Sequence, residues 1–151
     1  MDFRIRQGEI SDQEWLYKLY CSTMRTYIEQ TWGWDEEFQK KGFQTNLHPA
    51  KFRIVNVNDD DVSAYLVNDE DNHYWLEMLL VGSTMQGKGL GTAIIKKLQA
   101  ETKKGGKPLK LSVLRVNPAK EFYSRLGFFV YDQDESFFKM EWADNKPIQP
   151  M

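Results

Sequence analysis

The chain contains a glycine-rich segment whose composition is suited to binding an anion. It reads Gln86-Gly87-Lys88-Gly89-Leu90-Gly91 and follows an apolar run at residues 74–81. Glycines at alternate positions let the backbone turn and approach a ligand closely, because no Cβ is present. Apolar residues at helical spacing come next, and the free N–H groups and dipole of a helix's first turn favour a negative charge. The segment therefore predicts a pyrophosphate-binding loop at a strand-to-helix turn.

Two common nucleotide motifs fit this segment poorly. A dinucleotide-binding loop requires G-x-G-x-x-G and an acidic residue about 20 residues further on. Here the third glycine comes one position early, and Leu114 and Arg115 follow the next expected strand. A nucleoside-triphosphate loop fits from Gly82 to Lys88, but Gly89 replaces the hydroxyl residue that holds magnesium. The spacing that remains is Q-x-x-G-x-G, and a glycine-rich connector that binds no ligand is an alternative interpretation of it.

The elements that must position this loop can be predicted from hydrophobic patterning. Apolar runs and alternations predict strands at residues 3–6, 52–57, 62–67, 74–81, 109–113, 128–131 and 136–142. The polar stretch at residues 58–61 predicts a hairpin turn. With the helices placed between them, the order is β-α-α-β-β-β-α-β-α-β-β, a mixed sheet with helices on its faces.

Helix boundaries are predicted from capping residues. Ser11 and Glu14 form a capping box at the start of the first helix. A second, less regular helical region spans residues 24–41 and is interrupted by Gly33. A last helix opens at Asn117, an N-cap followed by proline, and closes at Gly127.

Composition limits the class of protein. The 151 residues suit one domain, with a core at about residues 3–142 and a frayed tail at 143–151. Hydrophobic residues at 41% and aromatic residues at 14% argue against disorder. The net charge of −2, without a basic stripe, gives no case for a nucleic-acid partner. No stretch approaches the ~20 apolar residues of a membrane span.

Cysteine and histidine are too scarce for several kinds of site. Cys21 is the single cysteine, which excludes a disulfide framework and fits a reducing cytoplasm. With His48 and His73 as the two histidines, we expect no metal site.

A second motif makes the glycine segment more specific. Residues 117–128 contain Asn117, Phe122-Tyr123 and Leu126-Gly127-Phe128. Together with Q-x-x-G-x-G and the order of elements, this segment resembles the GNAT superfamily of N-acetyltransferases, over about residues 3–142. The resemblance implies an α/β (α+β) fold with a mixed, largely antiparallel sheet of about seven strands and helices on both faces.

The resemblance also implies acetyl-coenzyme A as the acetyl-donating cosubstrate. The backbone at Leu79, Leu80 and Val81 would pair with the pantetheine arm where this strand splays from its parallel neighbour, while their side chains belong to the core. Backbone N–H groups from Gly87 to Thr92 would hold the pyrophosphate, with Gln86 bracing the loop and Lys88 adding a charge. The implied cofactor-binding residues are Leu79, Leu80, Val81, Gln86, Gly87, Lys88, Gly89, Leu90, Gly91, Thr92 and Asn117. For Asn117 the N-cap role is an equal explanation.

Two residues are candidates for proton transfer. Tyr123 occupies the position of the family's signature tyrosine, which implies a general acid that protonates the departing thiolate. The alternative is a half-buried structural aromatic, and many family members have one more residue between the asparagine and the tyrosine. Glu77 lies in an apolar strand and so needs a partner, a raised pKa or a wet cleft. Some family members use an acid on this strand to accept the amine proton; a salt bridge to Arg53 or Arg115 is the alternative.

The sequence indicates the residues that would bind the acceptor less clearly. In this fold the first two helices line the acceptor side, where the candidates are Tyr27, Glu29, Trp32 and Trp34. Aromatic walls and carboxylates would suit a cationic amine. The alternative is that Trp32 and Trp34 pack in the core and that the acids cover a solvated face.

The sequence thus predicts a cytoplasmic enzyme, monomer or homodimer, with neither a membrane nor a nucleic acid as partner. It would transfer acetyl from acetyl-coenzyme A to a primary amine of a small molecule or peptide, by direct attack in a ternary complex. A non-catalytic acyl-coenzyme A sensor or partner-binding module is the alternative.

Overall fold

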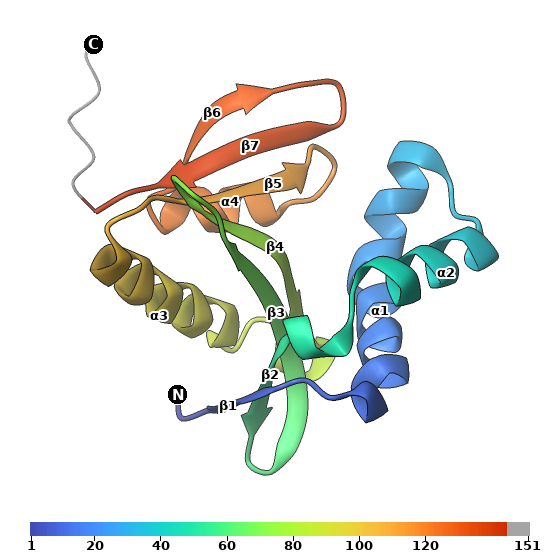
Figure 1. Ribbon diagram of the computed structural model, residues 1–151. Coiled ribbons are helices and arrows are strands. Elements are labelled where there is room, and N and C mark those ends of the chain that lie inside the picture. The colour runs from blue at the N-terminus through green and yellow to red at the C-terminus, as the bar shows by residue number, and fades with distance from the viewer. Residues whose placement is uncertain (145–151) are drawn as a thin grey trace. The chain divides into compact units, whose positions relative to one another are not determined.

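The computed structural model describes residues 1–144 (Figure 1). Seven strands of this part form one sheet in the order β1-β2-β3-β4-β5-β7-β6. The β1–β2, β2–β3, β5–β7 and β6–β7 pairs are antiparallel and the β4–β5 pair is parallel, which confirms the mixed, largely antiparallel sheet that the resemblance implied. The predicted tail spans residues 143–151, and its part from position 145 on lies outside the described residues. The strands are β1 (Arg4–Gln7), β2 (Arg53–Val57), β3 (Asp60–Asp69), β4 (Tyr74–Val81), β5 (Leu109–Leu114), β6 (Phe129–Gln133) and β7 (Phe137–Trp142).

Four helices accompany the sheet in the described residues, namely α1 (Gln13–Trp32), α2 (Glu36–Asn46), α3 (Leu90–Gly105) and α4 (Ala119–Arg125). The chain divides into two compact units. The first comprises Met1–Val67 and Glu77–Gly91, and the second comprises Asn68–Leu76 and Thr92–Met151. Both β4 and α3 pass from one unit into the other.

The predicted start of the first helix is wrong. A 3-10 turn at Ile10–Asp12 precedes α1, and Asp12 rather than Ser11 carries the polar contact, because its Oδ2 accepts the Glu9 N–H at 2.8 Å. The predicted second region is also redrawn, since α1 runs unbroken to Trp32 and ends at Gly33, whose φ is +85°. α2 then begins after Asp35, which accepts the Phe38 N–H at 3.0 Å.

The β2–β3 hairpin of the first unit is tighter than predicted. Asn58 and Asp59 both have positive φ, 52° and 69°, which is the geometry of a two-residue turn that matches strand twist. Strand β3 therefore begins at Asp60, inside the predicted loop. Asparagine and aspartate tolerate this left-handed conformation better than other non-glycine residues.

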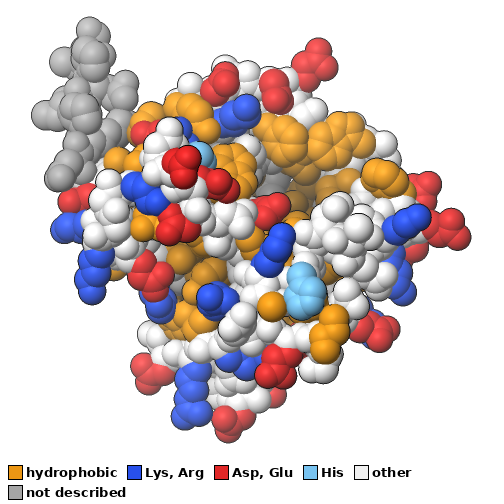
Figure 2. Space-filling model, in the orientation of Figure 1, with side chains coloured by type: hydrophobic (Ala, Val, Ile, Leu, Met, Phe, Trp, Pro, Cys, Tyr) orange, Lys and Arg blue, Asp and Glu red, His pale blue; other side chains and the backbone are white. Residues whose placement is uncertain are grey.

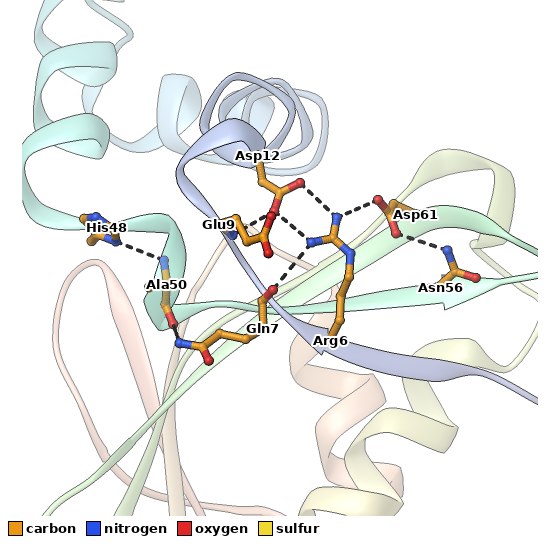
Figure 3. Close-up of polar contacts among 8 residues, drawn as sticks. All are labelled: Arg6, Gln7, Glu9, Asp12, His48, Ala50, Asn56 and Asp61. Carbon is orange, nitrogen blue, oxygen red and sulfur yellow. Dashed lines mark hydrogen bonds and ion pairs between the residues drawn. The ribbon is translucent and has the colours of Figure 1, made fainter.

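A polar network ties the start of β3 to β1 and α1 (Figure 3). The Arg6 guanidinium donates to both carboxylate oxygens of Asp12 at 2.9 Å and to Asp61 at 2.8 Å, and Asp61 also accepts from Asn56 at 3.1 Å. The hydrogen bond from Arg6 lowers the pKa of Asp12. The network holds Asp61, and with it the first residues of β3.

In the second unit, α4 begins at Ala119 with Pro118 in the N-cap position, one residue later than the predicted start. Asn117 Oδ1 still accepts the Ala119 N–H at 2.9 Å and so caps the first turn, and the predicted end is confirmed, since Gly127 has a φ of +94° after the last turn. Lys107 follows α3, binds Asp69 and lies over the Tyr74 ring at 4.6 Å from its centroid.

On the face shown in Figure 2, acidic and basic side chains are interspersed. No helix of residues 1–144 is both long and apolar enough to cross a membrane.

We predict that Asp12→Asn lowers the free energy of unfolding by about 1–2 kcal/mol at pH 7. This figure allows for solvent screening of the ion pair, because the Arg6 side chain is partly exposed. The folded-state pKa of Asp12 lies below its unfolded value. The stabilisation is therefore present at neutral pH and is lost as the pH falls from about 4 through the folded-state pKa. Urea denaturation of both proteins at pH 7 and pH 3 measures this. Glu101→Gln, in the exposed pair with Lys97, is the control and should change little. A gap between the wild type and Asp12→Asn that persists unchanged at pH 3 would contradict the prediction.

Candidate functional site

The loop after β4 has the backbone geometry that its glycines predicted. A 3-10 turn at Ser83–Met85 leads to Gln86, and α3 begins at Leu90. Gly87 and Gly89 have φ of +76° and +86°, a region in which other residues are strained. A Cβ placed on either glycine would meet nothing within 4 Å, so the space in front of the loop is open.

The electrostatics of this loop favour an anion. The first N–H groups of α3, at Leu90, Gly91 and Thr92, have no acceptor within the helix, as in any helix. No acidic side chain lies in the first turn of α3 to compete for them. Lys88 is exposed and makes no ion pair with another described residue. Free donors, the helix dipole and a nearby ammonium group all suit a phosphate.

The end of β4 presents backbone groups on one side. In the second unit, the first residues of β4, Tyr74–Leu76, pair in parallel with the β5 residues 109–111. Further along, the Leu80 carbonyl accepts the Ser63 hydroxyl at 2.6 Å and the Gly82 N–H donates to the Val62 carbonyl at 2.9 Å, so both residues face β3. Neighbouring residues of a strand direct their backbone groups to opposite sides, which turns Leu79 and Val81 away from β3.

Gln86 connects the loop to this strand end. Its Nε2 donates to the Val81 carbonyl at 3.1 Å. Of the backbone groups turned away from β3, the Val81 carbonyl therefore has a partner in the Gln86 side chain. The structure thus brings the predicted residues 79–81 and 86–91 together in the first unit.

Tyr123 lies in the second unit, on α4, and is 8% exposed. Its ring packs edge-on against Phe122 and Phe128, with centroids 5.1 and 5.5 Å away. None of the described residues makes a hydrogen bond with its hydroxyl. Burial raises the pKa of Tyr123, which keeps the phenol protonated at neutral pH. This is the form that a general acid needs.

Glu77 is exposed, although β4 is otherwise buried or half-buried around it. The exposure of Glu77 meets one of the conditions that the sequence set for this carboxylate, contact with water. The interpretation of Asn117 as a helix cap is confirmed by its bond to Ala119, and a cofactor contact by Asn117 stays a prediction.

The acceptor candidates divide into two groups. Arg25 pairs with Glu29 at 3.3 Å and lies 5.2 Å over the Trp34 ring, so an internal cation already occupies the place predicted for an amine. Trp34 Nε1 also donates to Glu36 at 2.7 Å. Trp32, by contrast, is 59% exposed, and the alternative that placed it in the core is wrong. Tyr27 is half-buried.

Sequence reasoning missed Ser63. This serine is fully buried in β3 and holds the Leu80 carbonyl. Its only signal was a hydroxyl residue inside the apolar run at 62–67.

A comparison with known families assigns the chain. The profile of the acetyltransferase (GNAT) domain matches residues 14–143. The chain belongs to the GNAT family of acetyltransferases. No curated protein sequence matches it significantly.

Solved acetyltransferases share the GNAT fold seen here. The PaiA N-acetyltransferase from Thermoplasma acidophilum, in complex with coenzyme A, is 22% identical with a TM-score of 0.75, and the match covers 93% of this chain and 98% of that one. An acetyltransferase from Thermus thermophilus is 18% identical with a TM-score of 0.73, covering 94% and 97%. Arabidopsis thaliana Naa50, with the bisubstrate analogue CoA-Ac-MVNAL, is 12% identical with a TM-score of 0.66, covering 95% and 99%. The likeness to these GNAT proteins establishes the fold.

We predict that the Tyr123 phenol stays protonated well above pH 10, its ordinary pKa, because burial penalises the phenolate. The folded state then binds the proton more tightly than the unfolded chain, so stability is constant below pH 10 and falls as the pH rises beyond it. The check is the difference in phenolate absorbance between the wild type and Tyr123→Phe during alkaline titration. A difference that appears near pH 10 in folded protein would refute the prediction.

Proposed function

We propose that this protein transfers acetyl from acetyl-coenzyme A to a primary amine of a small molecule or a peptide. The observation that carries the proposal is the continuity of two features. The end of β4 turns the backbone of Leu79 and Val81 away from β3, to which Leu80 and Gly82 are bonded, and it leads through Gln86 directly into a loop of free N–H donors. An extended ligand with amide groups at one end and phosphates at the other fits that sequence of groups, and coenzyme A has this form.

The residues present fit the parts of coenzyme A. The open space above Gly87 and Gly89 admits the pyrophosphate, and the first turn of α3 supplies donors to it. The backbone groups of Leu79 and Val81, turned away from β3, can pair with the amides of the pantetheine arm as a neighbouring strand would. Lys88 adds a positive charge near the phosphates.

The proposed reaction is a direct attack. The amine nitrogen forms a bond to the thioester carbonyl carbon as the carbon–sulfur bond breaks, and the amine loses a proton to Glu77 or to a water beside it. Tyr123 donates its proton to the departing thiolate. Burial holds the Tyr123 phenol in the protonated form that its role requires, and the exposed Glu77 side chain can be reached by an amine or a water. Holding both substrates together supplies much of the acceleration.

For the acceptor, the exposed Trp32 and the half-buried Tyr27 are candidate aromatic groups on α1. At Glu29 and Trp34, a cationic amine would compete with Arg25. Naa50 was solved with the bisubstrate analogue CoA-Ac-MVNAL, which supports including peptides with free N-termini among the candidates, and PaiA was solved with coenzyme A, which supports the proposed donor.

We predict that Tyr123→Phe lowers kcat by about 10²-fold and leaves the affinity for coenzyme A little changed, because the hydroxyl acts on the leaving group. The measurement is free-thiol release from acetyl-coenzyme A with polyamines, amino acids, aminoglycosides and peptides with free N-termini. Unchanged turnover in the variant would remove Tyr123 from the mechanism. Tight binding of coenzyme A without acceptor-dependent release would favour a non-catalytic acyl-coenzyme A sensor.

We predict that Gly89→Ala weakens coenzyme A binding at least 10-fold, because its backbone is strained at positive φ and its Cβ enters the space for the pyrophosphate. The matched control is Gly106→Ala, after α3, where φ is also positive and a Cβ also meets nothing within 4 Å. Isothermal titration calorimetry should show a loss only for Gly89→Ala, with similar thermal stability for the two. Equal affinities in the two variants would overturn the assignment of the loop.

A further inference from the structure

Ser63 stands out because it is a polar residue at a fully buried position of β3. A buried hydroxyl costs free energy unless it makes a hydrogen bond. Alanine would fill nearly the same volume without that cost. The Ser63 hydroxyl is satisfied by the Leu80 carbonyl of β4, at 2.6 Å, and this contact is what the serine adds.

A second contact ties Gly82, the residue after Val81, to β3. The Gly82 N–H donates to the Val62 carbonyl at 2.9 Å, and a Cβ on Gly82 would lie 2.6 Å from that oxygen, so glycine permits this close approach of the two strands. Leu80 and Gly82 are thus both tied to β3. Val81, between them, is held with its backbone turned the opposite way.

The strand that makes these ties is itself anchored. Asp61 comes immediately before Val62 and Ser63, and it accepts a hydrogen bond from Arg6 at 2.8 Å (Figure 3). The chain of contacts from Arg6 through Asp61 to β3 and then to Leu80 lies within the first unit.

We propose that Ser63 is a positioning residue of the acyl-donor site, which acts by holding the Leu80 carbonyl toward β3 and thereby directs the backbone of Leu79 and Val81 at the pantetheine arm. This inference rests on the proposed function. Ser63 touches no substrate in this role. Its loss changes the binding of the pantetheine half of coenzyme A and not of the nucleotide half, which the loop at 86–91 holds.

The test compares two ligands on three proteins. The ligands are coenzyme A and its nucleotide half alone, adenosine 3′-phosphate 5′-diphosphate. The proteins are the wild type, Ser63→Ala and a control, Thr102→Val. Thr102 is 3% exposed and donates its hydroxyl to the Gln99 carbonyl at 3.2 Å within α3, so the control also removes a buried hydroxyl bond. Calorimetric titration measures the ratio of the two affinities, which a general loss of stability would not change.

We expect Ser63→Ala to weaken coenzyme A binding about 10-fold with the affinity for the nucleotide unchanged, and Thr102→Val to alter neither. Ser63→Cys, which keeps the volume and a weak donor, should fall between the wild type and Ser63→Ala. Equal losses for both ligands, or no loss for either, in Ser63→Ala would overturn the positioning role while leaving the proposed function intact. A wild type that binds neither ligand would overturn both.

Discussion

The hydrogen bonds that tie the end of β4 to β3 are the interaction on which the candidate donor site depends. The Leu80 carbonyl accepts the Ser63 hydroxyl, and the Gly82 N–H donates to the Val62 carbonyl. Because neighbouring residues of a strand direct their backbone groups to opposite sides, Leu79 and Val81 are turned away from β3. A ligand with amide groups can use backbone groups that are held in this orientation.

The loop that follows β4 offers backbone groups to phosphates, as the end of the strand offers them to amides. Positive φ at Gly87 and Gly89 turns the chain from β4 into α3 within a few residues, which places the helix N-terminus close after the strand end. The Gln86 side chain reaches back to Val81 across this turn. Backbone dipoles, which cost no reorganisation when a ligand arrives, thus supply most of the expected recognition, and Lys88 adds one formal charge.

The two proton-transfer candidates differ in environment as their roles require. Tyr123 is enclosed by aromatic rings, and low polarity stabilises its neutral form. Glu77, on β4, is exposed to solvent, as a side chain that accepts a proton from an amine or a water must be. On α1, Arg25 already holds Glu29 and Trp34, so charge and aromatic content alone overstated the number of groups offered to an amine.

The sequence by itself determined the order of strands and helices, the glycine loop, the Asn117 cap and the family, because these depend on local patterns and on residue types at fixed spacing. Three features were decided by the tertiary structure. The start of α1 moved from Ser11 to a turn at Asp12, whose carboxylate binds Arg6 of β1, six residues earlier. Trp32 is exposed as the last residue of α1, which ends at Gly33. Ser63 gained its contact from Leu80, 17 residues along the chain, and only the pairing of β3 with β4 brings that carbonyl to the hydroxyl. Local patterns carry no information about which distant residue will lie opposite, and that is what the packing of strands supplies.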